Sequence, residues 1–296
     1  MSGLNTVLYD APGPAARRRS LFGSLAGGAL IVALLAVIVM RLSDRGVLDG
    51  DRWRIFTNPR RGDASDIWRS LLLEGLGATL RAAGLSAVLA LALGVLLVIL
   101  RLTPATAVRL PVTAVIELFR GVPVVLLMFF GVIALGLPIF YGVVFGLVIY
   151  NAAIIGEILR AGVVSLPKGQ SEAAYALGLT RRQTMFTILL PQAIRRMLPS
   201  LISQFVVLLK DTSLGFIIGY TELLRVIRLN AEFFGNRFWF PLFFVGAGIY
   251  ILINFSLSRL AVWLERRGTF KAAGGVVRAD PAQLAPTPGG GLGGAP

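Results

Sequence analysis

The sequence contains no cysteine and no histidine, and only 15% of its 296 residues are charged. Without cysteine, the chain can form no disulfide, thiolate nucleophile or cysteine-ligated metal site. Without histidine, it also lacks the commonest metal ligand and the usual proton carrier near neutral pH. The pattern G-x-x-x-x-G-K-[ST] is absent as well, so the chain has no P-loop for ATP. These absences weigh against most classes of enzyme, and we expect no cofactor in this chain.

Apolar side chains are abundant in the sequence. Hydrophobic residues make up 56% of the sequence and the mean hydropathy is +0.78. A soluble domain of this length needs more charge to cover its surface, so the composition predicts an integral membrane protein. The net charge of +14 then indicates basic cytoplasmic segments facing anionic lipid rather than a nucleic-acid partner.

Long uncharged runs predict an all-α membrane protein with six transmembrane helices. The predicted spans are 21–40, a second with 82–100 as its core, 111–134, 139–160, roughly 198–219, and 238–258 extended to about Leu264. The first run follows three arginines, but it is too long for a signal peptide and no A-x-A site follows, so we expect a retained helix. Glycines in the spans are expected where helices approach closely. They include Gly75, Gly77, Gly84 and Gly94.

Lysine and arginine set the predicted orientation, because cytoplasmic loops are enriched in them. They favour a multi-pass membrane protein with both termini in the cytoplasm. An odd number of spans, or a first helix that only lies on the membrane, stays open. The predicted organisation is a basic N-terminus (1–20), an extra helix (21–40), an extracytoplasmic loop (41–70), a membrane domain (71–267) and a tail (268–296). That tail is rich in glycine, proline and alanine and is expected to be disordered and cytoplasmic.

The stretch SEAAYALGLTRRQTMFTILLP, residues 171–191, is short and partly charged, yet apolar runs flank it. It predicts two short helices joined by a turn, called the hairpin below. The local signals are a first cap at Gln170 or Ser171, a left-handed turn at Gly178, a capping box of Thr180 and Gln183, and a helix end at Pro191.

Two small helices with an alanine-rich face suit docking into a groove of another protein. An ordinary ordered loop is the plainer alternative. A membrane-anchored regulator that reads DNA through a helix–turn–helix is another, but both ends of the hairpin re-enter the membrane within a few residues. A channel or secondary carrier that works without ATP is a third alternative.

The hairpin closely resembles the EAA loop of permease subunits of bacterial ATP-binding-cassette importers. That pattern is E-A-A, three residues, G, nine residues and I-x-L-P, and every fixed position matches here. The matching residues are Glu172, Ala173, Ala174, Gly178, Ile188, Leu190 and Pro191.

This resemblance implies the type-I importer fold, here with one extra N-terminal helix, and a cytoplasmic hairpin that couples to an ATPase. It also implies several partners. They are a separate ATP-binding-cassette ATPase that uses the ATP, a second permease that is identical or homologous, an extracytoplasmic amino-acid-binding protein, and membrane lipid.

Three further stretches, 117–130, 157–170 and 210–225, are similar to segments of polar amino acid importers. The extra first helix and the segments LDGDRW (48–53) and NFSLSRLAVWLERR (254–267) resemble actinobacterial glutamate-uptake permeases. The resemblance therefore implies glutamate as the substrate. Glutamine, arginine and other polar amino acids remain alternatives.

Five charged residues lie within or beside predicted spans: Glu117, Arg120, Glu157, Lys210 and Asp211. A charge facing lipid near the midplane costs about 2.5–3.5 kcal/mol on insertion scales, so these groups are expected to face the bundle interior, an aqueous path or each other. We assign them to the translocation path or its gating. The simpler alternative is local pairing at i,i+3, between Glu117 and Arg120 and between Glu157 and Arg160.

Overall fold

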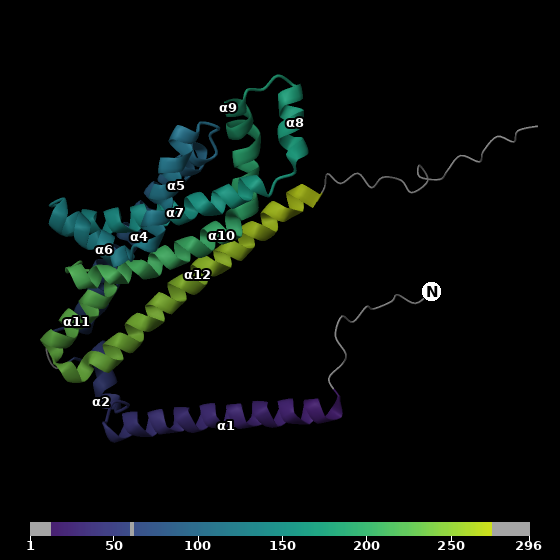
Figure 1. The fold of residues 1–296 in the computed structure, drawn as a ribbon. Coiled ribbons are helices and arrows are strands. Elements are labelled where there is room, and N and C mark those ends of the chain that lie inside the picture. The colour runs from purple at the N-terminus through teal and green to yellow at the C-terminus, as the bar shows by residue number, and fades with distance from the viewer. Residues whose placement is uncertain (1–12, 60–61, 274–296) are drawn as a thin grey trace, which may run out of the picture.

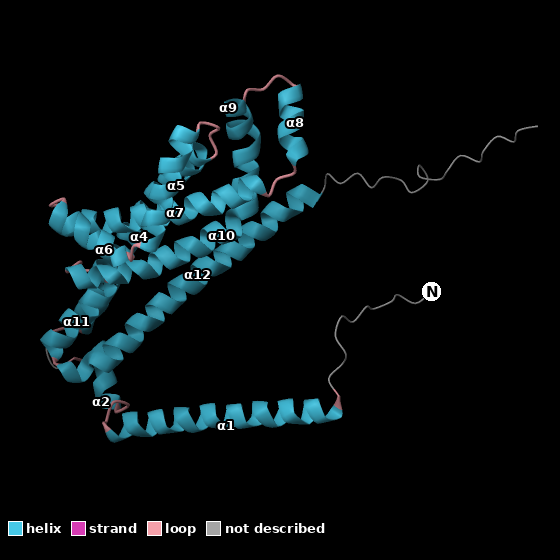
Figure 2. Cartoon of the chain, viewed as in Figure 1, coloured by secondary structure: helices cyan, strands magenta, loops and turns pink. Residues whose placement is uncertain are grey.

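A computed structural model describes residues 13–59 and 62–273. Within these ranges the chain is built of helices and contains no strand (Figures 1 and 2). Five helices are long and apolar enough to cross a membrane, and the bent pair of α5 and α6 makes a sixth if it counts as one span. The structure therefore confirms the all-α membrane fold and agrees with six crossings.

Seven helices of twelve residues or more form the frame of the molecule. They are α1 (Pro14–Asp44), α4 (Gly77–Arg101), α5 (Thr106–Gly121), α7 (Ile139–Val164), α10 (Leu190–Asp211), α11 (Leu223–Phe234) and α12 (Trp239–Ala273). The shorter α-helices are α2 (Gly50–Trp53), α3 (Ala64–Arg69), α6 (Val124–Phe129), α8 (Lys168–Ala176) and α9 (Arg181–Gln183). The 3₁₀ and π segments are η1 (Arg54–Phe56), η2 (Ser70–Leu76), η3 (Phe130–Ala134), η4 (Thr184–Leu189), η5 (Thr212–Ile218) and η6 (Asn236–Phe238).

The first helix, α1, stands apart from the bundle (Figure 1). It begins at a proline in its first turn, where the missing N–H costs no hydrogen bond. None of its residues is buried against the rest of the chain. At about 1.5 Å per residue its 31 residues span about 46 Å, enough to cross a membrane.

The bundle centres on α7, which packs against α4, α6 and α10. Close approach depends on glycine at two of the four positions expected from the sequence. A Cβ atom on Gly94 would lie 2.7 Å from the side chain of Ile155, and one on Gly75 would lie 3.0 Å from the backbone of Leu223. The expectation is wrong for Gly84, around which a Cβ would meet nothing within 4 Å.

The prediction of one continuous helix over 111–134 is wrong. Helix α5 ends at Gly121, α6 begins at Val124, and their axes differ by 104°. Pro123 explains the break, because it has no backbone N–H and pushes the residue before it out of the α conformation. Val122 accordingly has φ −85° and ψ 127°.

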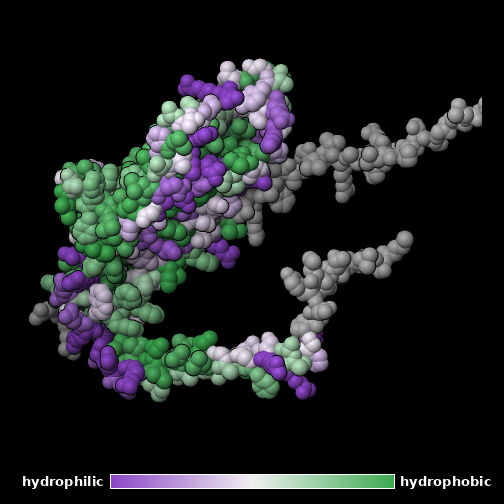
Figure 3. Space-filling model, viewed as in Figure 1, coloured by the Kyte–Doolittle hydropathy of each residue, from purple (hydrophilic) through white to green (hydrophobic). Residues whose placement is uncertain are grey.

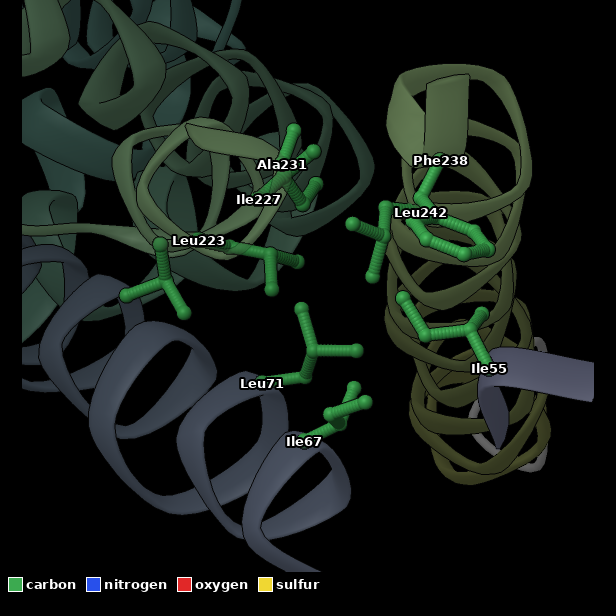
Figure 4. Close-up of a cluster of buried hydrophobic side chains, with 9 residues drawn as sticks. Ile55, Ile67, Leu71, Leu223, Ile227, Ala231, Phe238 and Leu242 are labelled. Atoms are coloured by element: carbon green, nitrogen blue, oxygen red, sulfur yellow. The ribbon is translucent and has the colours of Figure 1, made fainter. Parts of the chain in front are cut away.

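The segment predicted as a loop between the first two spans contains α2, η1 and α3. Figure 4 shows Ile55 and Ile67 from this segment pointing toward Leu223 and Leu242 of the membrane domain. Each of these four side chains is at most 1% exposed. The ring of Trp53 also lies edge-on to those of Phe240 and Phe244 in α12. The segment is thus attached to α11 and α12 by an apolar core.

Polar residues gather at two opposite ends of the molecule. In Figure 3, hydrophilic residues cover the region around α2 and the region around α8 and α9, with a mostly hydrophobic surface between them. This distribution fits a membrane-spanning body with two exposed ends. Helix α12 continues to Ala273, past residue 267 where the membrane domain was predicted to end, and residues 274–296 of the predicted tail lie outside the described ranges.

Candidate coupling hairpin and transport path

The hairpin projects from one end of the bundle, far from α2 and α11 (Figure 1). Its first helix, α8, follows α7 after a short turn, and Arg196 of α10 donates a 3.0 Å hydrogen bond to the carbonyl of Ser165 in that turn. The predicted cap at Gln170 or Ser171 is wrong, because α8 already begins at Lys168 with Pro167 as its N-cap. The rigid φ of proline suits this helix start.

The predicted turn between the two helices is confirmed. Gly178 has φ +80°, a left-handed conformation that favours glycine, and its N–H donates to the carbonyl of Tyr175. Thr180 and Gln183 form the expected capping box, in which each side chain bonds the backbone of the other. The turn is therefore fixed by local chemistry.

The predicted helix end at Pro191 is wrong. Helix α9 continues through the π-helical η4 into α10, so residues 181–218 form one long helical segment. Pro191 lies in the first turn of α10, directly after the π-helical stretch. In a π-helix the N–H groups bond carbonyls five residues back, so the hydrogen-bond pattern is shifted by one residue in this stretch. This shift accommodates a proline, which has no N–H to donate. The second arm of the hairpin is thus continuous with a membrane helix.

The residues of the EAA pattern divide into two groups by exposure. Ala174 and Leu190 are buried, and Ile188 and Pro191 are half-buried, so these four hold the hairpin together. Glu172, Ala173 and Gly178 are exposed. The most exposed apolar side chain of the hairpin is Leu177, with 82% of its surface accessible.

Tyr175 and Phe186 are 45% and 44% exposed and add apolar surface to the hairpin. Sequence reasoning did not single out Leu177 or Tyr175 as surface residues. The sequence signal for the exposure of Leu177 is its position directly before a glycine in a left-handed conformation, where the chain turns outward. The hairpin therefore carries three exposed apolar side chains, Leu177, Tyr175 and Phe186, on a surface that is otherwise mostly polar.

The structure brings three of the predicted path residues together. Glu117 pairs with Arg120 at 3.2 Å and Glu157 pairs with Arg160 at 2.7 Å, which confirms both i,i+3 pairs. Arg101, at the end of α4, joins the two pairs: it bonds Glu117 at 3.3 Å and also bonds Glu157. Sequence reasoning missed Arg101 because it served only to mark the end of an apolar run.

Lys210 and Asp211 lie at the far end of α10 from the hairpin. Lys210 is exposed and lines a groove of about 630 Å³ between α10, α11 and α12, whereas Asp211 is half-buried and does not line it. The two neighbours thus face different directions, as their helical spacing requires. The polar groups of this groove are Lys210, Ser213, Tyr250, Asn254 and Ser258.

Lys210 and Asn254 differ in how their polar groups are placed in the groove. Among the described residues there are six ion pairs, and Lys210 is in none of them. The side-chain oxygen of Asn254 is buried and accepts no hydrogen bond in the described part of the chain. A lysine without an ion-pair partner in the described ranges, on the wall of a mostly apolar groove, suits the carboxylate of a small ligand.

Glu222 is a buried acid that sequence reasoning missed altogether. Its side chain is fully buried and caps α11 by accepting from the N–H groups of Leu224 and Arg225, and it also accepts from the hydroxyl of Tyr250. These bonds tie the start of α11 to α12 beside the groove. Elsewhere in the described ranges, no group of three acidic, histidine or cysteine residues is placed to hold a metal ion.

Comparisons with known proteins identify the family of the chain. The family model described as "Binding-protein-dependent transport system inner membrane component" matches residues 90–269. The "Glutamate transport system permease protein GluD" of Corynebacterium glutamicum is 44% identical over 234 residues, which are 76% of this chain and 83% of that protein. The "Glutamate/aspartate import permease protein GltK" of Escherichia coli is 36% identical over 221 residues, 69% of this chain and 97% of that protein.

The fold is also known from solved structures. A crystal structure of "an amino acid ABC transporter with histidines" superposes with a TM-score of 0.62 at 28% identity, covering 69% of this chain and 97% of that chain. An inward-facing structure of the MetNI methionine ABC transporter superposes with a TM-score of 0.55 at 21% identity, and this likeness concerns the fold alone. The matched family model covers well over half of the sequence, and the chain is an amino acid permease of the family of binding-protein-dependent transport system inner membrane components.

Proposed function

We propose that the chain is the permease of an ATP-driven importer for glutamate, with the hairpin in the cytoplasm. The observation that carries the proposal is the exposure of Leu177, Tyr175 and Phe186 on a capped hairpin whose second arm is continuous with the membrane helix α10. The similarity to a glutamate permease over 76% of the chain supports the substrate.

In the proposed assembly, the hairpin lies in a cleft of a separate ATPase subunit that uses the ATP. A second permease, identical or homologous, completes the membrane pore, and an extracytoplasmic binding protein delivers the amino acid. ATP binding favours one state of the ATPase pair, and this preference shifts the bundle between inward-facing and outward-facing states.

The proposed path for glutamate passes the groove between α10, α11 and α12. A substrate carboxylate would pair with Lys210 on the wall of this groove. The arrangement supports a polar cargo because a few polar groups, which can fix the orientation of a ligand, line an otherwise apolar groove. The cluster of Glu117, Arg120 and Glu157 lies elsewhere and is proposed to take part in gating.

The alternative of a DNA-reading helix–turn–helix is not proposed. A recognition helix must enter the major groove on a free face, whereas α9 continues directly into the membrane helix α10. The hairpin therefore has little freedom to reach DNA.

Reconstitution tests the proposed function. The chain, its ATPase and its second permease are assembled in proteoliposomes, and the binding protein is added on the extracytoplasmic side. We expect accumulation of labelled glutamate that requires ATP and is competed by excess unlabelled glutamate more strongly than by glutamine or arginine. Uptake that persists without ATP would indicate a channel or secondary carrier, and stronger competition by another amino acid would change the substrate.

A further inference from the structure

Arg101 bonds two carboxylates in the charged cluster that it forms with Glu117, Arg120, Glu157 and Arg160. It is the last residue of α4, and its side chain is only 15% exposed. One guanidinium nitrogen bonds Glu157 of α7, and the other bonds Glu117 of α5 at 3.3 Å. Among the described residues, no other side chain joins three of the long helices by ion pairs.

Each of the two carboxylates is also held from its own helix. Arg160 bonds Glu157 at 2.7 Å, and Arg120 bonds Glu117 at 3.2 Å. These local bonds fix the carboxylates in place, so Arg101 meets two oriented acceptors. A planar guanidinium can bond two carboxylates at once, which a lysine ammonium on a flexible stem does less well.

The cluster lies close to the hairpin along the chain. Glu157 is seven residues, or about two helical turns, before the end of α7, and α8 starts four residues after that end. Arg196 ties the intervening turn to α10. A displacement of the hairpin therefore reaches the last turns of α7 directly.

Glu117 lies on a unit of two helices that bends sharply at its middle. Helix α5 turns by 104° into α6, so the pair forms a bent arm rather than a straight span. The arm packs against α7 at Gly146, where an added Cβ would lie 2.6 Å from the backbone of Met128. This close contact and the Arg101 bridge hold the arm to α7 at two separated points.

We propose that Arg101 is a positioning residue that transmits movement of the hairpin from α7 to the bent arm of α5 and α6. The inference rests on the proposed function, since it concerns how ATP hydrolysis in a partner is coupled to transport. Coupling of this kind needs a contiguous set of contacts between two sites. The bridge from Glu157 through Arg101 to Glu117 supplies one.

The test measures coupling rather than activity alone. In the full reconstituted complex, Arg101→Gln should lower ATP-dependent glutamate uptake at least tenfold, while ATPase activity stimulated by the binding protein stays within about twofold of wild type. Arg101→Lys should recover part of the uptake per ATP. Arg109→Gln is the matched control, because Arg109 is exposed on α5 and forms no ion pair among the described residues.

Wild-type uptake per ATP in Arg101→Gln would overturn the inference, and so would an equal fall of uptake and ATPase activity in an assembled complex. If the complex that carries Arg101→Gln fails to assemble, Glu117→Gln tests the inference instead, because this substitution removes only the α5 side of the bridge. We expect at least a threefold fall in uptake per ATP, and an unchanged ratio contradicts the inference. Failure of the proposed function would appear differently, as absence of ATP-dependent uptake in the wild-type complex.

Discussion

Leu177→Asp is expected to raise the dissociation constant of the complex between this permease and its ATPase at least about 100-fold. Leu177 is 82% exposed at the end of the hairpin. Burying a leucine against a partner contributes about 1.5–3 kcal/mol, and a carboxylate in the same apolar cleft adds a desolvation cost. Since 1.4 kcal/mol is a factor of ten, the two effects together exceed about 100-fold. The measurement is titration of detergent-solubilised permease with purified ATPase.

Leu177→Met is the matched control, because it keeps volume and apolar character and should bind nearly as wild type does. Near-wild-type affinity of Leu177→Asp would show that the ATPase does not bury this side chain. Glu172→Lys offers an independent check on the same hairpin, since Glu172 is exposed on α8 about one helical turn before Tyr175. We expect it to weaken coupling of ATPase activity to uptake.

Lys210→Gln is expected to raise the glutamate concentration needed for half-maximal uptake by about 10- to 150-fold. Lys210 lines the groove beside α12 and has no ion-pair partner among the described residues. A hydrogen bond to a charged group contributes about 1.5–3 kcal/mol, which sets the size of the effect. ATPase activity and assembly should change little, because Lys210 lies at the far end of α10 from the hairpin.

A chemical rescue distinguishes a cargo contact from a packing role for Lys210. The chain has no cysteine, so Lys210→Cys gives a single thiol in this subunit. Modification with an ethylammonium reagent should restore uptake, modification with an ethylsulfonate reagent should not, and glutamate should slow both reactions. If Lys210→Cys transports normally before modification, Lys210 is not on the path.

The hairpin was the most predictable part of the molecule because its signals are local. The left-handed Gly178 and the capping box of Thr180 and Gln183 follow from residue types at fixed spacing, and both are present. The helix end at Pro191 was not predictable in this way. Proline breaks an ordinary α-helix, and only the π-helical register before it lets the helix continue.

The charged cluster was only half predictable, and the reason is distance along the chain. Pairs at i,i+3, such as Glu157 with Arg160, are read directly from helical periodicity. Arg101 lies 56 positions before Glu157, and only the packing of α4 against α7 brings them together. The buried Glu222 has the same origin, because its partner Tyr250 lies 28 positions away on α12.

The segment before the second span shows how an apolar core can be hidden in a polar sequence. Residues 41–70 contain many arginines and aspartates and predict a solvated loop. The structure instead fixes this segment through a few well-spaced apolar residues, among them Ile55 and Ile67, that meet α11 and α12. Those partners in α11 and α12 are more than 150 positions away along the chain, so no local sequence pattern predicts these contacts.

Site-specific photo-crosslinking at Leu177 tests the central claim most directly. A benzoylphenylalanine is placed at position 177 of the full chain in native membranes that contain the whole transporter. The control position is Thr221, which is exposed beside α11 at the opposite end of the molecule. The account predicts a covalent product with the ATPase subunit from position 177 and none from position 221. No product at 177, or equal products from both positions, would contradict it.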